Sequence, residues 1–127
     1  MFTWCRNNAA LEDPAFTHAL QANAKNSSDE ALAWRRYLLA CSASHAIHLD
    51  GDFVECGVYL GTGIKTVIDY YGKERFGKDF WGDDTFDYHP TTGHDFEEQR
   101  NGLLQRVQER FAEDSMVRLI KGLPPES

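Results

Sequence analysis

The sequence has little positive charge, and that charge is not clustered. Its 13 Lys and Arg residues are outnumbered by 20 Asp and Glu residues, which gives a formal net charge of −7. The adjacent basic pair Arg35-Arg36 falls on what we expect to be a solvated helix face. Proteins that bind nucleic acid by neutralising phosphates need a clustered basic surface. We therefore expect no nucleic-acid partner.

Cysteines and long apolar runs are also scarce. The three cysteines, Cys5, Cys41 and Cys56, are odd in number and form no C-x-x-C spacing, which favours reduced thiols over a disulfide framework. No stretch approaches the roughly 18 apolar residues that a membrane span needs, and residues 1–8 contain no apolar signal core. We expect a soluble, cytoplasmic protein with no membrane partner, and we expect Cys56 to be a small buried apolar residue.

The remaining composition is that of a small folded protein. A length of 127 residues with 42% hydrophobic and 13% aromatic residues is sufficient for one packed domain. We divide the chain into an N-terminal extension, residues 1–26, and a domain, residues 27–127. Asp13-Pro14 predicts the cap and first position of a short helix over residues 15–24 of the extension.

The domain alternates between helical and strand patterns. Ser27 and Glu30 have the form of a capping box before a helix over residues 29–48. In that helix Trp34, Tyr37 and Leu38 are expected to lie in the core. A buried strand at residues 53–58 comes next, and then come a helix at 63–71 ended by Gly72, a strand at 79–82, a helix at 97–113 and a strand at 116–120. This order is typical of an α/β fold in which right-handed crossovers join parallel strands.

Three glycines lie between the first strand and the helix after it. Gly57, Gly61 and Gly63 allow a sharp backbone turn and close approach of a ligand, because glycine lacks a Cβ. The spacing G-x-x-x-G-x-G does not match the dinucleotide fingerprint G-x-G-x-x-G. A Walker loop is excluded too, since Ile64 separates Gly63 from Lys65-Thr66.

The segment does match the E/D-x-G-x-x-x-G-x-G pattern of class I methyltransferases, through Glu55 and the three glycines. The wider string from Gly51 to Tyr59 resembles more particularly the macrocin O-methyltransferase family. Asp84-Thr85-Phe86 resembles that family's acid followed by Ser/Thr-Phe, about 30 residues after Glu55, near the separation expected for a ribose-binding acid. Lys121-Gly122, after the third strand, resembles its adenine-side segment.

The resemblance implies an S-adenosylmethionine cofactor and transfer of a methyl group to a hydroxyl of a small molecule or sugar. It places Glu55 near the methionine or ribose part and Asp84 on both ribose hydroxyls, where a carboxylate suits directional hydrogen bonds. Tyr59 is expected either to cover the cofactor or to be a surface aromatic residue. The full set of implied cofactor-binding residues is Glu55, Gly57, Tyr59, Gly61, Thr62, Gly63, Asp84, Thr85, Phe86 and Gly122.

The chain differs from the family beyond the third strand. The complete family fold adds strands and an acidic cluster that holds a magnesium ion, and no metal ligand or catalytic base can be assigned here. His89 and His94 are candidate acid–base groups, since histidine titrates near neutral pH.

The expected architecture is a truncated, Rossmann-like three-layer sandwich whose partial, doubly wound parallel sheet has the order 3-2-1. Its first strand would have an open edge, which favours a homo-oligomer or a fragment of a longer protein.

Simpler interpretations of these residues stay open. The glycines can form an ordinary strand-to-helix turn that binds nothing. Glu55 can cap the next helix, and Asp84 can make a local Asx bond. The alternative function is therefore a non-catalytic module that acts in oligomerisation or interaction, and binding of another nucleotide is a third hypothesis.

Overall fold

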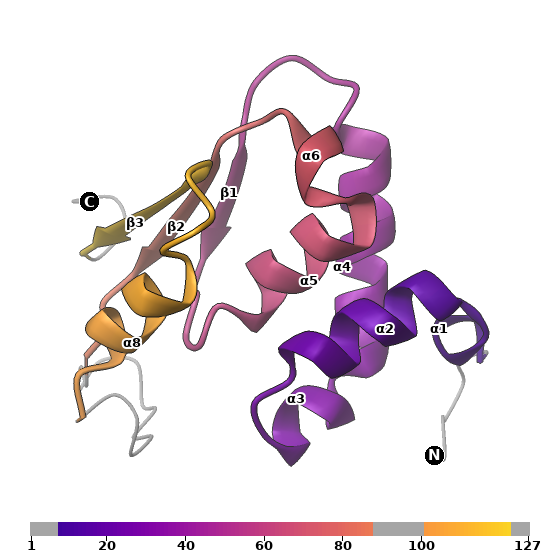
Figure 1. The fold of residues 1–127 in the computed structure, drawn as a ribbon, viewed down its shortest axis with the longest axis horizontal. Helices are drawn as coiled ribbons and strands as arrows, with labels where there is room; N and C mark the ends of the chain where they lie inside the picture. The colour runs from indigo at the N-terminus through magenta and orange to yellow at the C-terminus, as the bar shows by residue number, and fades with distance from the viewer. Residues whose placement is uncertain (1–7, 88–100, 123–127) are drawn as a thin grey trace. The chain divides into compact units, whose positions relative to one another are not determined.

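The computed structural model describes residues 8–87 and 101–122 (Figure 1). The chain forms two compact units. The first comprises Met1–Leu49 and Lys65–Phe76, and the second comprises Asp50–Ile64 and Gly77–Ser127. His89 and His94 lie outside the described residues, as do positions 123–127. In the described part of the chain, no helix is long and apolar enough to cross a membrane.

The first unit is helical. It contains α1 (Ala9–Glu12), α2 (Pro14–Asn23), α3 (Ser27–Ala31), α4 (Ala33–Ala46), α6 (Lys73–Phe76) and most of α5 (Thr62–Tyr71). Phe16 is fully buried at its centre, and the Tyr37 and Tyr70 rings meet it edge-on at centroid distances of 5.0 and 6.3 Å. Trp34 and Tyr37 pack against this core as expected, whereas Leu38 is 51% exposed, so its core assignment was wrong.

Asp13 begins α2 in the way that the sequence predicts. Its Oδ1 accepts hydrogen bonds from the backbone N–H groups of Ala15 and Phe16 at 3.0 and 3.1 Å, and Pro14 occupies the first turn. Its Oδ2 accepts a third hydrogen bond, at 2.8 Å, from the Tyr70 hydroxyl on α5. One carboxylate therefore both starts a helix and joins it to another.

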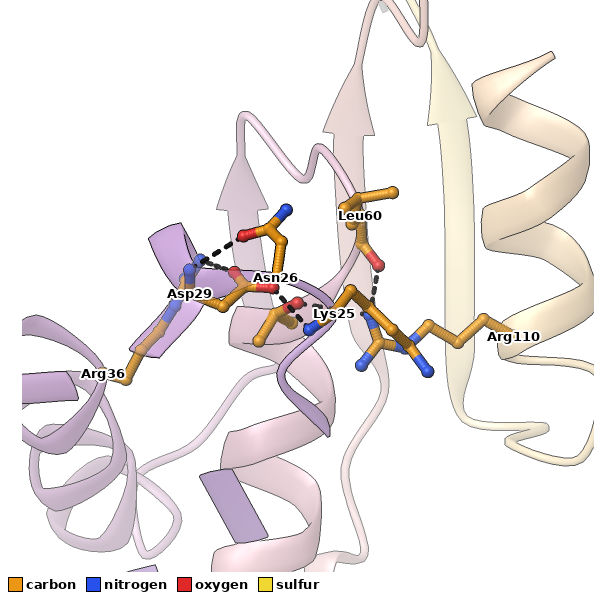
Figure 2. Close-up of polar contacts among 7 residues, drawn as sticks. Lys25, Asn26, Asp29, Arg36, Leu60 and Arg110 are labelled. Atoms are coloured by element: carbon orange, nitrogen blue, oxygen red, sulfur yellow. Dashed lines mark hydrogen bonds and ion pairs between the residues drawn. The ribbon is translucent and has the colours of Figure 1, made fainter. Parts of the chain in front are cut away.

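The single helix expected over residues 29–48 is interrupted at Leu32, between α3 and α4. The predicted cap is also displaced by one residue, because α3 already begins at Ser27. The Asn26 side chain accepts a hydrogen bond from the Asp29 N–H at 3.0 Å, and the Asp29 carboxylate accepts one from the Lys25 N–H at 2.9 Å (Figure 2). The buried Asp29 also lies 3.9 Å from the Arg36 guanidinium. Asn26 therefore caps α3, and Asp29 holds the residue before the cap.

The second unit is built on a parallel sheet of β1 (Phe53–Cys56), β2 (Phe80–Asp84) and β3 (Val117–Lys121) (Figure 1). The strand order is β1-β2-β3, which confirms both the α/β class and the predicted order. The unit also contains α8 (Leu103–Arg110), which is shorter than the helix expected over residues 97–113, because residues 101–102 and 111–113 form turns.

One face of the sheet is tightly packed at Gly82 in the middle of β2. A Cβ on Gly82 would lie 2.9 Å from the Val58 side chain, 3.0 Å from Ile64 and 3.2 Å from Leu119.

β1 is less buried than predicted, because Val54 is 63% exposed and Cys56 is exposed. Both residues occupy the alternate positions of the strand, on the side opposite to Phe53 and Glu55. The three-layer arrangement and the domain boundary after residue 26 stay predictions.

Candidate functional site

The candidate site is formed where β1 and β2 end, at the carboxyl edge of the sheet. Asp84, the last residue of β2, accepts a hydrogen bond on Oδ2 from the Tyr59 N–H in the glycine loop, at 2.7 Å. Its Oδ1 accepts a second one from the Phe86 N–H at 2.9 Å. Three residues that the sequence singled out, Tyr59, Asp84 and Phe86, are thus brought together. Two of them lie 25 positions apart in the chain.

The two backbone donors occupy an uncommon conformation. Tyr59 has φ of 50° and Phe86 has φ of 49°, in the left-handed region that side-chain-bearing residues seldom adopt. Residues held in this region persist where surrounding interactions compensate for the strain. The Asp84 carboxylate supplies such an interaction to both residues, so it fixes the loop after β1 and the turn after β2 in one arrangement.

Gly57 leaves open space at the tip of β1. Its N–H donates to the Asp83 carbonyl at 2.8 Å, and its φ is +89°. A Cβ placed on Gly57 would meet no atom of residues 8–87 and 101–122 within 4 Å. Approach of a ligand to Gly57 stays a prediction.

Gly61 is instead required by packing inside the protein. A Cβ on this residue would lie 2.6 Å from the ring of Phe111, the residue after α8, and its φ is +75°. The space beside Gly61 is thus occupied by an aromatic side chain. Gly63 is the second residue of α5.

Arg110 holds the same loop from α8. Its Nη1 donates to the Leu60 carbonyl at 2.6 Å (Figure 2) and to the hydroxyl of the buried Thr62 at 3.2 Å. Sequence patterns did not connect Arg110 or Phe111 with the glycine loop. The two residues lie about 50 positions beyond the loop, and no local pattern links them to it.

The other predicted site residues lie around this arrangement. The Gly122 N–H donates to the Asp84 carbonyl at 3.0 Å, which ties the end of β3 to the end of β2. The Thr85 hydroxyl donates to the Asp87 carbonyl at 3.0 Å. Glu55 is half-buried in β1, in register with Gly82. Binding of the cofactor by Glu55 and capping of the next helix by Glu55 both stay predictions.

The local interpretation of Asp84 is confirmed, because the bond to the Phe86 N–H two residues on is an Asx bond. This bond uses only part of the hydrogen-bond acceptor capacity of the Asp84 carboxylate. Each carboxylate oxygen has two lone pairs, so Asp84 retains acceptor capacity beyond the two backbone N–H groups. Among the described residues, no cluster of three or more His, Cys, Asp or Glu side chains is placed to hold a metal ion.

Comparisons with known proteins add no relative: no family model, curated protein or solved structure matches the chain.

Proposed function

We propose that the chain is the S-adenosylmethionine-binding part of a macrocin-type O-methyltransferase that has a Rossmann-like fold and transfers a methyl group to a hydroxyl of a small molecule or sugar. The observation that carries the proposal is the hydrogen bond of 2.7 Å between the Asp84 carboxylate and the Tyr59 N–H in the glycine loop. It puts the acid of the second strand beside the turn of the first. Open α/β sheets bind ligands beyond the carboxyl ends of their strands, where these two groups lie.

The residues present suit the parts of this cofactor. Gly57 provides open space at the strand tip, and the remaining lone pairs of Asp84 suit a pair of ribose hydroxyls. Asp84 and Glu55 also supply negative charge at an edge that would receive a positively charged sulfonium.

The bound cofactor would supply a methyl group on positively charged sulfur. The chain's own contribution is to bind and orient, since the Arg110 and Asp84 contacts hold the loop in one shape. In-line attack on a methyl group depends largely on such positioning. The acceptor, the base and any magnesium ligands would come from further strands or from a partner.

The alternative, a non-catalytic module, has a specific observation in its favour. Gly61 packs against the Phe111 ring, where a side chain would not fit, and the Asp84 carboxylate accepts hydrogen bonds from two backbone N–H groups. Both residues therefore have structural roles without a ligand.

A matched pair of glycine substitutions tests the proposal. Gly51 and Gly57 stand at opposite ends of β1, have φ of +104° and +89°, and would each place a Cβ in open space. Gly51→Ala and Gly57→Ala should therefore suffer similar backbone strain, about 1–2 kcal/mol. Only Gly57→Ala puts a methyl group at the carboxyl edge.

The measurement is calorimetric titration with S-adenosylmethionine and with its demethylated product. We expect an affinity on the order of micromolar, unchanged in Gly51→Ala and at least tenfold weaker in Gly57→Ala. No heat at millimolar ligand would favour the non-catalytic module, and a preference for phosphate-bearing ligands would indicate another nucleotide.

A further inference from the structure

The peptide group between Leu60 and Gly61 in the glycine loop is bound at both of its polar ends. Its carbonyl oxygen accepts a hydrogen bond from Arg110 Nη1 at 2.6 Å (Figure 2). Its N–H donates to the Val58 carbonyl at 2.9 Å. A rotation of this peptide group would break both hydrogen bonds, so its orientation is fixed from outside the loop as well as from within it.

A second peptide group, between Val58 and Tyr59, is bound in the same way. Its carbonyl oxygen accepts the hydrogen bond from the Gly61 N–H, and its own N–H donates to Asp84 Oδ2 at 2.7 Å. A continuous series of hydrogen bonds therefore runs from the Arg110 guanidinium through two peptide groups to the Asp84 carboxylate. We call this series the loop network.

The charges at the two ends of the loop network suit its direction. Each peptide group turns its carbonyl oxygen, which is its negative end, toward Arg110 and its N–H, which is its positive end, toward Asp84. A cation at one end and an anion at the other therefore stabilise the same orientation of both peptide groups. Hydrogen bonds in such a series polarise and strengthen one another. Loss of either charged end should therefore weaken the hydrogen bond that the other end makes.

Arg110 is well placed to end the loop network. It is the last residue of α8, where the negative end of the helix dipole favours a cation. Its side chain is half-buried, so its charge is screened less than that of a fully solvated arginine. The ring of the next residue, Phe111, packs against Gly61. The end of α8 therefore contacts two consecutive residues of the loop, Leu60 and Gly61.

We propose that Arg110 is a positioning residue of the cofactor site, which acts on Asp84 through the loop network. Its role in binding rests on the proposed function, in which the Asp84 carboxylate accepts hydrogen bonds from the ribose. The loop network sets the position of the Tyr59 N–H, and this N–H holds one oxygen of the carboxylate in place. A carboxylate that is already held in place requires less ordering when a ligand binds, which favours affinity.

A double-mutant cycle between Arg110→Met and Asp84→Asn tests the loop network in urea unfolding, without a ligand. Methionine keeps an apolar stem and removes the donors. The factor by which both substitutions together raise the equilibrium constant of unfolding should be smaller than the product of the two separate factors, by about threefold or more. Arg106→Met is the matched control, since Arg106 is an exposed arginine one turn earlier on α8. Its factor should multiply with that of Asp84→Asn to within about twofold.

Calorimetric titration with S-adenosylmethionine tests the positioning role. We expect Arg110→Met to bind about fivefold more weakly than the native chain, and Arg106→Met to bind like the native chain. Arg110→Lys should recover part of the lost affinity, because its ammonium group can still donate to the Leu60 carbonyl. If Arg110 only filled space, the lysine and methionine variants would bind alike.

The two measurements separate this proposal from the proposed function. Factors that simply multiply for Arg110→Met and Asp84→Asn would overturn the loop network. Equal affinities of the native chain and Arg110→Met, or of the lysine and methionine variants, would overturn the positioning role. No binding by the native chain would instead refute the proposed function, and the unfolding measurement would still decide whether Arg110 and Asp84 are coupled.

Discussion

The Asp84 carboxylate should be a main determinant of stability in the second unit, and Asp84→Asn tests this. The carboxylate accepts hydrogen bonds from Tyr59 N–H at 2.7 Å and Phe86 N–H at 2.9 Å. An asparagine has nearly the same shape but one acceptor oxygen, so its amide group would oppose one of the two backbone donors. One charge-assisted hydrogen bond is lost, which costs about 1.5–3 kcal/mol.

The cost matters because the two donors, Tyr59 and Phe86, both adopt left-handed conformations. Each such conformation costs about 1–2 kcal/mol for a residue with a side chain, and the lost bond no longer offsets it. A loss of about 1.5–3 kcal/mol is a large part of the roughly 5–15 kcal/mol that stabilises a typical domain.

Urea unfolding followed by circular dichroism measures the effect, with Asp83→Asn as the control. Asp83 precedes Asp84 in the same strand, and its buried Oδ1 has no hydrogen-bond partner among the described residues. Neutralising Asp83 should therefore leave the free energy of unfolding unchanged or raise it. Equal losses in the two variants would refute the assigned role of Asp84, because a general effect of charge would then suffice.

Two further predictions concern packing and pH. Gly61→Ala should lower the free energy of unfolding by about 2–4 kcal/mol, since its Cβ would lie 2.6 Å from the Phe111 ring at φ of +75°. Adding Phe111→Leu should recover part of that loss in urea unfolding, and strictly additive losses would contradict the clash. In the first unit, partial burial and the hydrogen bond to Asp13 raise the pKa of Tyr70 above its usual 10. The protonated folded state is thus favoured below pH 10, and its stability should fall as pH rises from 10 upward. Tyr70→Phe should unfold with a weaker dependence on alkaline pH, and an identical dependence would argue against the Tyr70–Asp13 bond.

The sequence by itself predicted the three strands, their order and most of the helices, but not α1, α6 or the break between α3 and α4. The Asp13-Pro14 start of α2 and the end of α5 before Gly72 both depend on neighbouring residues. Local sequence can therefore predict them. The parallel order β1-β2-β3 results from the same pattern, because alternating helices and strands leave few right-handed arrangements.

Local sequence was a less reliable guide to which of two adjacent residues caps a helix and to whether a strand residue is buried. Ser27 and Asn26 are both good caps, and the structure uses Asn26. An apolar strand sequence predicts burial, yet Val54 and Cys56 are exposed, because exposure depends on what covers the sheet and on which strand is at its edge.

Only the tertiary structure decided what each site residue does. It separated two glycines of one motif, since Gly57 borders open space and Gly61 accommodates Phe111. It also showed that Arg110 holds the loop at Leu60 and that Asp84 binds the Tyr59 N–H. These contacts join residues 25 to 50 positions apart, and such distances are closed by the packing of α8 and the sheet rather than by any local preference.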